Sequence, residues 1–209
     1  MIVEKSDFYA LLRSRRSIRR FTDRTVPVEL VQRLIEAACQ APSAHNRQPW
    51  RFAVLSGESE KQALAGEMGQ ALCAARRADG DAAEAIDADA ARSYQRITSA
   101  AVVVVVCLTM EAMDVYPDEA RTNAEHMMAV QSAAMAGMNI LLAAHAEGLG
   151  ACWLCAPLFA PDAARRSLDL PKTWEPQGLI LLGYAAEQGR SRERMPLDPT
   201  NGLHRRRWL

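Results

Sequence analysis

The chain has 209 residues, and its 25 Lys and Arg residues balance its 25 Asp and Glu residues, so that its formal net charge is zero. This length suffices for one α+β domain with a sizeable core, and the balanced charge argues against a general attraction to nucleic acids or membranes. The longest apolar run, residues 100–108, is too short to cross a bilayer, and the N-terminus lacks the pattern of a signal peptide. We therefore expect a cytoplasmic protein.

The N-terminal part of the chain predicts two helices separated by a proline. Asp7 can cap the first helix, which carries Leu11 and Leu12. Pro27 interrupts the chain and favours the start of the second helix. Apolar residues recur at helical spacing in this second helix and give it one buried face: Leu30, Leu34, Ile35 and Ala38.

Residues 13–21 form an arginine-rich segment, Arg-Ser-Arg-Arg-Ser-Ile-Arg-Arg-Phe, in which Arg15, Arg16, Arg19 and Arg20 surround Ser17. Guanidinium groups match the geometry of a phosphate, and a serine hydroxyl adds a further donor. The segment is therefore a candidate site for a ligand with an anionic tail. A solvated basic surface and a nucleic-acid-binding patch are the alternatives.

Residues 41–52 read Ala-Pro-Ser-Ala-His-Asn-Arg-Gln-Pro-Trp-Arg-Phe and predict a stiff loop. Pro42 and Pro49 prevent the preceding helix from continuing. Amide side chains on such a loop suit recognition of a flat ring whose edge carries both donors and acceptors. The alternative is a polar connection whose Trp50 enters the core.

Residues 58–91 are rich in Ala, Glu, Asp, Arg and Gln and contain few large apolar residues. These residue types favour helix, and Asp-Gly-Asp at 79–81 interrupts them, so the segment predicts two helices joined by a polar turn. It is either a lid over a site or a solvated helical hairpin.

The second half of the chain alternates between strands and helices. Residues 100–108, Ala-Ala-Val-Val-Val-Val-Val-Cys-Leu, predict a central strand covered on both faces. Residues 123–147 predict a long helix that is apolar around most of its circumference, and a partner subunit is a natural cover for it. Its methionines are alternatively plain core residues. Residues 151–154, 161–168 and 178–184 predict a short strand, a helix and a buried strand.

The five cysteines are an odd number, which fits a reducing compartment better than a disulfide framework. Cys152 and Cys155 have the Cys-x-x-Cys spacing of redox and zinc sites. A zinc site needs a second ligand pair at suitable spacing, and a redox dithiol needs a thioredoxin-like unit. Because the sequence shows neither, we favour structural or pocket-lining roles for both cysteines.

Arg-Arg-Ser-Ile-Arg-Arg-Phe at 15–21, followed by the loop at 41–52, resembles the opening of the nitroreductase family of FMN-dependent oxidoreductases. The resemblance continues in Gly-Leu-Gly-Ala-Cys-Trp at 148–153 and in the strand at 178–184. It implies a single nitroreductase-like FMN-binding α+β domain over residues 1–209, with a central mixed sheet flanked by helices. It also implies an intertwined homodimer with FMN at the subunit interface.

The resemblance implies four groups of cofactor-binding residues. They are Arg15, Arg16, Ser17 and Arg19 for the phosphate, ribityl and pyrimidine side; Pro42, Ser43, Asn46 and Gln48 from the partner subunit; Trp153, Leu154 and Cys155 for the dimethylbenzene or N5 face; and Arg192 and Arg194 for the phosphate. Many family members carry an acidic residue and a glycine where this chain has Cys155 and Ala156. Backbone N–H groups are the remaining donors to N5.

By the same resemblance, NAD(P)H donates a hydride to flavin N5 in a ping-pong reaction, and an electron-poor acceptor then receives it. Nitroaromatics, quinones and conjugated alkenes are acceptors of this kind. The chemistry belongs to the cofactor, while the protein positions the reactants and stabilises the reduced flavin. No protein side chain is assigned as a general acid and no metal is expected. The sequence also lacks the glycine-rich motifs of Rossmann domains and of P-loop NTPases.

Three other functions remain open at this stage. The segments at 116–125, 148–153 and 168–176 look like the flavin domain of proteins that build the deazaflavin coenzyme, which reduces a dehydro precursor with FMN. A non-catalytic flavin-binding module is an alternative from another class. A nucleic-acid-binding protein is the last alternative, and it depends on the arginines at 13–20 and 205–207.

Overall fold

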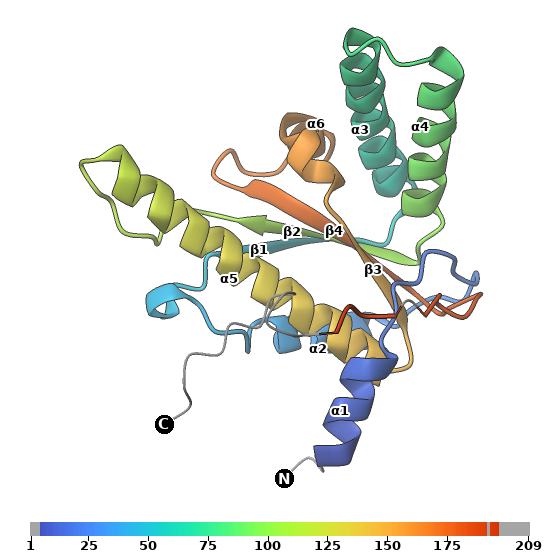
Figure 1. Cartoon of the computed structure of the whole chain (residues 1–209), viewed down its shortest axis with the longest axis horizontal. Helices are drawn as coiled ribbons and strands as arrows, with labels where there is room; N and C mark the ends of the chain where they lie inside the picture. Colours follow the sequence, from blue (N-terminus) through green and yellow to red (C-terminus); the bar gives the residue numbers. More distant parts are fainter. Residues whose placement is uncertain (1–4, 192, 197–209) are drawn as a thin grey trace.

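The computed structural model describes residues 5–191 and 193–196, and Figure 1 shows one sheet with helices on both of its faces. The sheet has four strands in the order β1-β2-β4-β3. The strands are β1 (Trp50–Leu55), β2 (Val102–Leu108), β3 (Gly150–Leu154) and β4 (Glu175–Gly183). The predicted α+β class is confirmed.

All three pairings within this sheet are antiparallel, whereas the family resemblance implied a mixed sheet. The parallel component in the described part of the chain is one isolated bridge, between Ser17 and Ala151 at the outer edge of β3. The connections explain the difference. The two helices that connect β1 to β2 leave the sheet and return to it at the same end. These two strands therefore run in opposite directions.

The helices form two layers. Helices α2 and α5 pack on one face of the sheet, and α3, α6 and the end of α4 pack on the other. The described helices are α1 (Lys5–Ser14), α2 (Val28–Ala38), α3 (Glu58–Ala78), α4 (Ala83–Thr98), α5 (Glu119–Ala146) and α6 (Pro161–Ser167), with short 3-10 turns η1 (Ala44–Asn46) and η2 (Ala156–Phe159).

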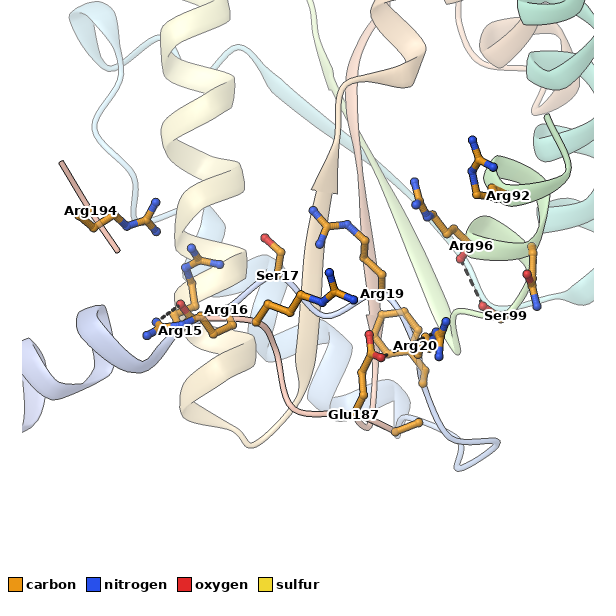
Figure 2. Close-up of a pocket in the computed structure, with 14 residues that line it drawn as sticks. Arg15, Arg16, Ser17, Arg19, Arg20, Arg92, Arg96, Ser99, Glu187 and Arg194 are labelled. Atoms are coloured by element: carbon orange, nitrogen blue, oxygen red, sulfur yellow. Dashed lines mark hydrogen bonds and ion pairs between the residues drawn. The ribbon is translucent and has the colours of Figure 1, made fainter. Parts of the chain in front are cut away.

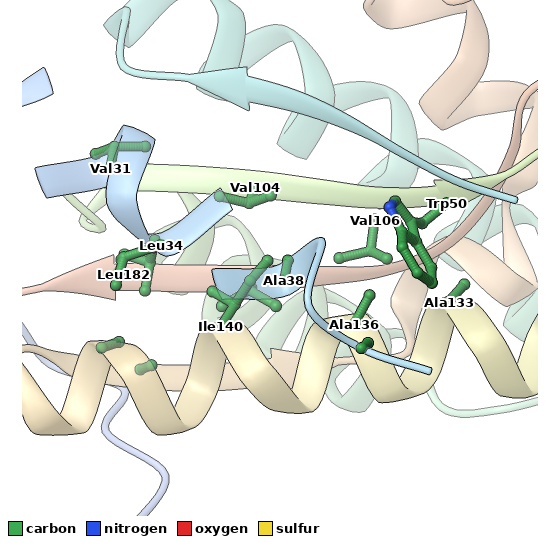
Figure 3. Close-up of a cluster of buried hydrophobic side chains, with 14 of the residues drawn as sticks. Val31, Leu34, Ala38, Trp50, Val104, Val106, Ala133, Ala136, Ile140 and Leu182 are labelled. Atoms are coloured by element: carbon green, nitrogen blue, oxygen red, sulfur yellow. The ribbon is translucent and has the colours of Figure 1, made fainter. Parts of the chain in front are cut away.

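Strand β2 explains the unbroken apolar run in the sequence. All seven of its residues are buried. Because successive side chains of a strand point to opposite faces, Val104 and Val106 face α2 and α5, while Val103 and Val105 face α3 and α6. Figure 3 shows the first of these cores, where Ile140 of α5 lies among the residues of α2 and the sheet. The central strand covered on both faces is therefore confirmed.

Helix α5 is the long helix that the sequence predicted, although it begins earlier, at Glu119. Asp118 caps it, since the Asp118 side chain accepts a hydrogen bond of 2.9 Å from the Arg121 N–H. By length and composition α5 could cross a bilayer, but part of its surface is buried against the sheet. Its other side leaves Met127 and Met138 about half exposed. The cover by a partner subunit and the cytoplasmic location stay predictions.

Helices α3 and α4 form the helical hairpin that the sequence predicted, and Figure 1 shows it projecting from the sheet. Gly80 closes the turn with a φ of +82°, a conformation that glycine adopts without strain. Helix α4 continues to Thr98, beyond the predicted end of the hairpin. The role as a lid stays a prediction.

Candidate functional site

An arginine-lined cavity of about 1040 Å³ lies beside the outer edge of β3 (Figure 2). Three parts of the chain build it: the segment after α1, the end of α4 and the segment after β4. The lining residues are Arg15, Arg16, Ser17, Arg19, Arg20, Phe21, Arg92, Gln95, Arg96, Ser99, Ala186, Glu187, Arg190 and Arg194. The arginine-rich segment of the sequence is thus one wall of a cavity.

The first wall is fixed by strand-like contacts with β3. The Ile18 N–H donates to the Ala151 carbonyl at 3.0 Å, and Ser17 forms the parallel bridge to the same residue. A Cβ on Gly150 would lie 2.8 Å from the Ile18 Cβ, so only glycine lets the two segments approach this closely. Ile18 is buried, and because side chains alternate along an extended segment, Ser17 and Arg19 both face the cavity.

The segment after β4 forms the second wall, and it lies against the first wall. The Thr22 N–H donates to the Tyr184 carbonyl at 2.8 Å, and the Ala186 N–H donates to the Arg20 carbonyl at 3.0 Å. Farther along, the Arg16 guanidinium donates to Ser191 Oγ at 3.2 Å. Arg194 therefore lines the same cavity as the N-terminal arginines. Arg192, predicted for the same phosphate, lies outside the described residues.

The third wall comes from α4, which the sequence analysis did not assign to the site. Three polar residues of this helix and its C-cap line the cavity: Arg92, Gln95 and Arg96, and Ser99. Their spacing of three and four residues places them on one helical face. This polar stripe was visible in the sequence, but only the folded chain shows that it faces the other arginines.

Cys152 and His145 lie close enough to the arginines for the positive charges to affect their pKa values. Burial raises the pKa of the Cys152 thiol, and the charges of Arg19 and Arg96 act in the opposite direction. Burial also lowers the pKa of His145, and Arg15 contributes to this shift because a second positive charge nearby disfavours protonation. His145 Nε2 and Ser14 Oγ are hydrogen-bonded at 2.8 Å.

The loop predicted at 41–52 lies at the opposite end of the sheet. Trp50, at the end of the loop, pairs with Leu108 at one end of β2. Ala151, which bonds to the arginine-rich segment, is aligned across β4 with Val102, at the other end of β2. Six residue steps along β2 separate these rows by about 20 Å. Pro42, Ser43, Asn46 and Gln48 therefore do not line the arginine cavity of their own chain.

This loop has a strained backbone that its own side chains hold in place. His45, Asn46 and Gln48 have φ values of 48°, 54° and 49°, which non-glycine residues rarely adopt. Ser43 Oγ accepts a hydrogen bond of 3.0 Å from the Gln48 N–H, and the Gln48 amide donates to Asn46 Oδ1 at 3.3 Å. Trp50 is buried in the core, as the simpler alternative expected. The two amide side chains are thus held in a fixed arrangement.

Trp153 and Leu154 end β3, and Cys155 follows them; none of the three lines the arginine cavity. The indole ring of Trp153 fits between α5 and β4, because a Cβ on Gly137 or Gly178 would lie 2.2 or 2.4 Å from its ring atoms. Its Nε1–H donates to Cys155 Sγ at 3.1 Å. Trp153 therefore anchors the end of this strand, and the Cys155 thiol is exposed.

A basic cavity beside an antiparallel sheet has the donors that a ligand with a phosphate group needs. The chain belongs to the nitroreductase family, since the model of that family matches residues 12–184. The predicted family, its fold and an FMN-dependent, NAD(P)H-linked oxidoreductase activity are thereby confirmed at family level.

Individual relatives agree with this assignment. The chain is 28% identical to a candidate NADH dehydrogenase/NAD(P)H nitroreductase of Methanothermobacter thermautotrophicus, over 99% of this chain and 90% of the relative. It is 29% identical to an NADH dehydrogenase of Thermus thermophilus, over 88% and 89% of the two chains. The crystal structure of a candidate nitroreductase from Desulfovibrio desulfuricans in complex with FMN has a TM-score of 0.70 and 29% identity, covering 94% of this chain and 95% of that one.

Proposed function

We propose that this protein transfers hydride from NAD(P)H to an electron-poor acceptor such as a nitroaromatic, a quinone or a conjugated alkene, in a ping-pong reaction. The observation that carries the proposal is the arginine cavity formed by segments from both ends of the described chain. Its donors fit FMN, because guanidinium groups bind a phosphate in a bidentate manner and the Ser17 hydroxyl adds a donor.

Within this proposal, Arg15, Arg16 and Arg194 bind the phosphate, together with Arg192 from outside the described residues. Ser17 and Arg19 then lie beside the ribityl and pyrimidine part. When bound, FMN supplies the hydride chemistry, accepting two electrons from the donor and passing them to the acceptor. Arg19 supplies positive charge close to a cofactor that becomes more negative on reduction.

The proposed site is completed by a second copy of the chain. The loop residues Pro42, Ser43, Asn46 and Gln48 stand about 20 Å from the cavity of their own chain, too far to contact the same flavin. We assign them to the flavin of the partner subunit, to which the exposed amides of Asn46 and Gln48 can donate and accept hydrogen bonds. The exposed methionines of α5 are a suitable surface for such a homodimer.

In the same proposal, Trp153, Leu154 and Cys155 face the dimethylbenzene or N5 side of the flavin. Trp153 acts there through its anchored ring, which fixes the end of β3, and the exposed Cys155 lies next to it. Backbone N–H groups at this turn are the donors to the flavin ring, since the side chains of Cys155 and Ala156 are weak or absent donors.

The test is a visible spectrum of the purified protein, followed by steady-state oxidation of NADH and NADPH with a nitroaromatic or a quinone. We expect a yellow protein, turnover with at least one pair, and parallel lines in double-reciprocal plots. A flavin that stays bound without turnover would instead identify a non-catalytic binding module. A colourless protein that does not bind added FMN would contradict the proposal.

The deazaflavin precursor stays an alternative acceptor, although the relatives described above are named for other reactions. Incubation of the reduced protein with the dehydro precursor tests it directly. A gain of two hydrogens in the product mass is the expected result for this alternative, and an unchanged mass rejects it.

A further inference from the structure

Two groups of arginines lie at opposite ends of the cavity. Figure 2 shows Arg15, Arg16 and Arg194 at one end, beside α1 and α5, and Arg92 and Arg96 at the other end, on α4. FMN carries a single phosphate, which occupies one end only. The α4 end of the cavity therefore has positive charge that the flavin phosphate does not neutralise.

The charge of the cavity exceeds what FMN supplies. Eight arginines line it in the described part of the chain, against the carboxylate of Glu187 in the lining and that of Asp89, which pairs with Arg92 from outside it. A phosphate monoester contributes between one and two negative charges, about −1.5 to −2. The volume of about 1040 Å³ also lies slightly above the range for small-molecule sites, which is about 300–1,000 Å³. Both charge and space favour a second, anionic ligand next to the flavin.

Arg92 is held in position by a network across the helical hairpin. Asp89 accepts hydrogen bonds from both Arg92 and Arg76, so it connects α4 to α3. Arg76 also pairs with Asp81 at 2.5 Å. The contact with Asp89 uses one terminal nitrogen of Arg92, whereas a guanidinium group carries five N–H donors. The remaining donors are accessible to a ligand, since the Arg92 side chain is 58% exposed.

Arg96 lies one turn farther along α4, about 6 Å along the helix axis, on the same face. Its charge reaches Cys152 on β3, so it stands between Arg92 and the arginine-rich segment. The arginines of α4 thus extend the positive surface away from the phosphate end of the cavity.

We propose that Arg92, assisted by Arg96, binds a phosphate or carboxylate group of the second ligand, which is the electron donor or the acceptor. This inference rests on the proposed function, since it places the flavin phosphate at the Arg15 and Arg16 end. Two sources supply the oxyanion: the additional phosphate that distinguishes NADPH from NADH, or an acidic group on the acceptor. Either one forms charge-assisted hydrogen bonds with a guanidinium.

The experiment compares Arg92→Ala, Arg92→Lys and Arg77→Ala with the unmodified protein. Arg77 is a matched control, because it is an exposed arginine of the same hairpin that does not line the cavity. Flavin absorbance and the thermal unfolding temperature are measured first for all four proteins. We expect them to agree, because Arg92 lies away from the phosphate end.

Two kinetic arms distinguish the sources of the anion. In the first, KM is measured for NADPH and NADH with a neutral quinone. In the second, KM is measured for 4-nitrobenzoate and for neutral 4-nitrobenzyl alcohol with a saturating donor. In one arm we expect Arg92→Ala to raise KM for the anionic member about tenfold relative to its neutral or less charged counterpart. Arg92→Lys should recover part of the preference, and Arg77→Ala should resemble the unmodified protein.

The outcomes separate this inference from the function on which it rests. A change in the donor arm identifies the phosphate of NADPH as the anion, and a change in the acceptor arm identifies an acidic acceptor. Unchanged preferences in both arms, with flavin bound and turnover intact, overturn the inference and leave the proposed function standing. An unmodified protein that does not bind FMN would reject the proposed function itself.

Discussion

The Arg16 guanidinium donates a hydrogen bond to Ser191 Oγ at 3.2 Å, which joins two segments 175 residues apart in the chain. A Cβ on the neighbouring Gly189 would lie 2.3 Å from the Arg16 Cβ, so the C-terminal segment passes directly over this arginine. The arginines proposed to bind the phosphate are therefore brought together by a contact between chain segments, and the site forms only when the whole sheet has folded.

Replacement of Arg16 by alanine should weaken the binding of FMN by about 10- to 100-fold, because charge-assisted hydrogen bonds contribute ~1.5–3 kcal/mol. Fluorescence titration with FMN measures the effect. Riboflavin is the matched ligand control, since it lacks the phosphate, and its affinity should change little. An equal loss for both flavins would place Arg16 away from the phosphate.

Gly137→Ala should destabilise the protein by about 1–3 kcal/mol, because the added methyl group would stand 2.2 Å from the Trp153 ring in a packed interior. Gly66→Ala is the matched control on α3, where nothing lies within 4 Å of the added Cβ. That substitution should stabilise the helix by ~0.5–1 kcal/mol. Urea unfolding of both variants compares the free energies. If the two effects have the same sign, the proposed slot for Trp153 is wrong.

His145 should make the free energy of unfolding fall in acid. Burial and the charges of Arg15 and Arg16 lower its pKa in the folded protein below 6.5, its ordinary value. As the pH drops below 6.5, the unfolded chain therefore takes up a proton before the folded one does, and the unfolded state gains stability. Urea unfolding on either side of pH 6.5 measures this loss, and His145→Gln should reduce it. An unchanged pH dependence in the variant would remove His145 as the cause.

Binding of FMN should shift the His145 pKa upward, because the phosphate would offset the charges of Arg15 and Arg16. A titration of the histidine ring signals by NMR, with and without FMN, follows this shift. Riboflavin should leave the His145 titration unchanged.

The cysteines should differ in reactivity towards iodoacetamide. Burial raises the pKa of the Cys107 thiol to about 12, and Cys107 is fully buried, so it should remain unmodified in the native protein. Cys39 and Cys155 are exposed and should react. Mass spectrometry of peptides measures each site. FMN should protect Cys155 if this residue faces the flavin, and equal reaction with and without FMN would reject that placement.

The sequence by itself determined the parts of this protein that depend on local pattern. The unbroken valine run gave β2, because a strand covered on both faces needs no polar alternation. The composition of residues 58–91 gave the α3–α4 hairpin, and two short motifs gave the family. The arginine-rich segment was recognised as a candidate anion site because guanidinium groups match the geometry of a phosphate.

Only the tertiary structure decided which segments meet. Arg92 and Arg96 belong to a helix with ordinary composition, and their place in the cavity follows from the way the hairpin returns to β2. The loop around Asn46 was recognised from its residues, but its distance from the cavity follows from the strand register. Periodicity reports which face of an element is buried. It carries no information on which other segment packs against that face, because this depends on pairing between distant parts of the chain.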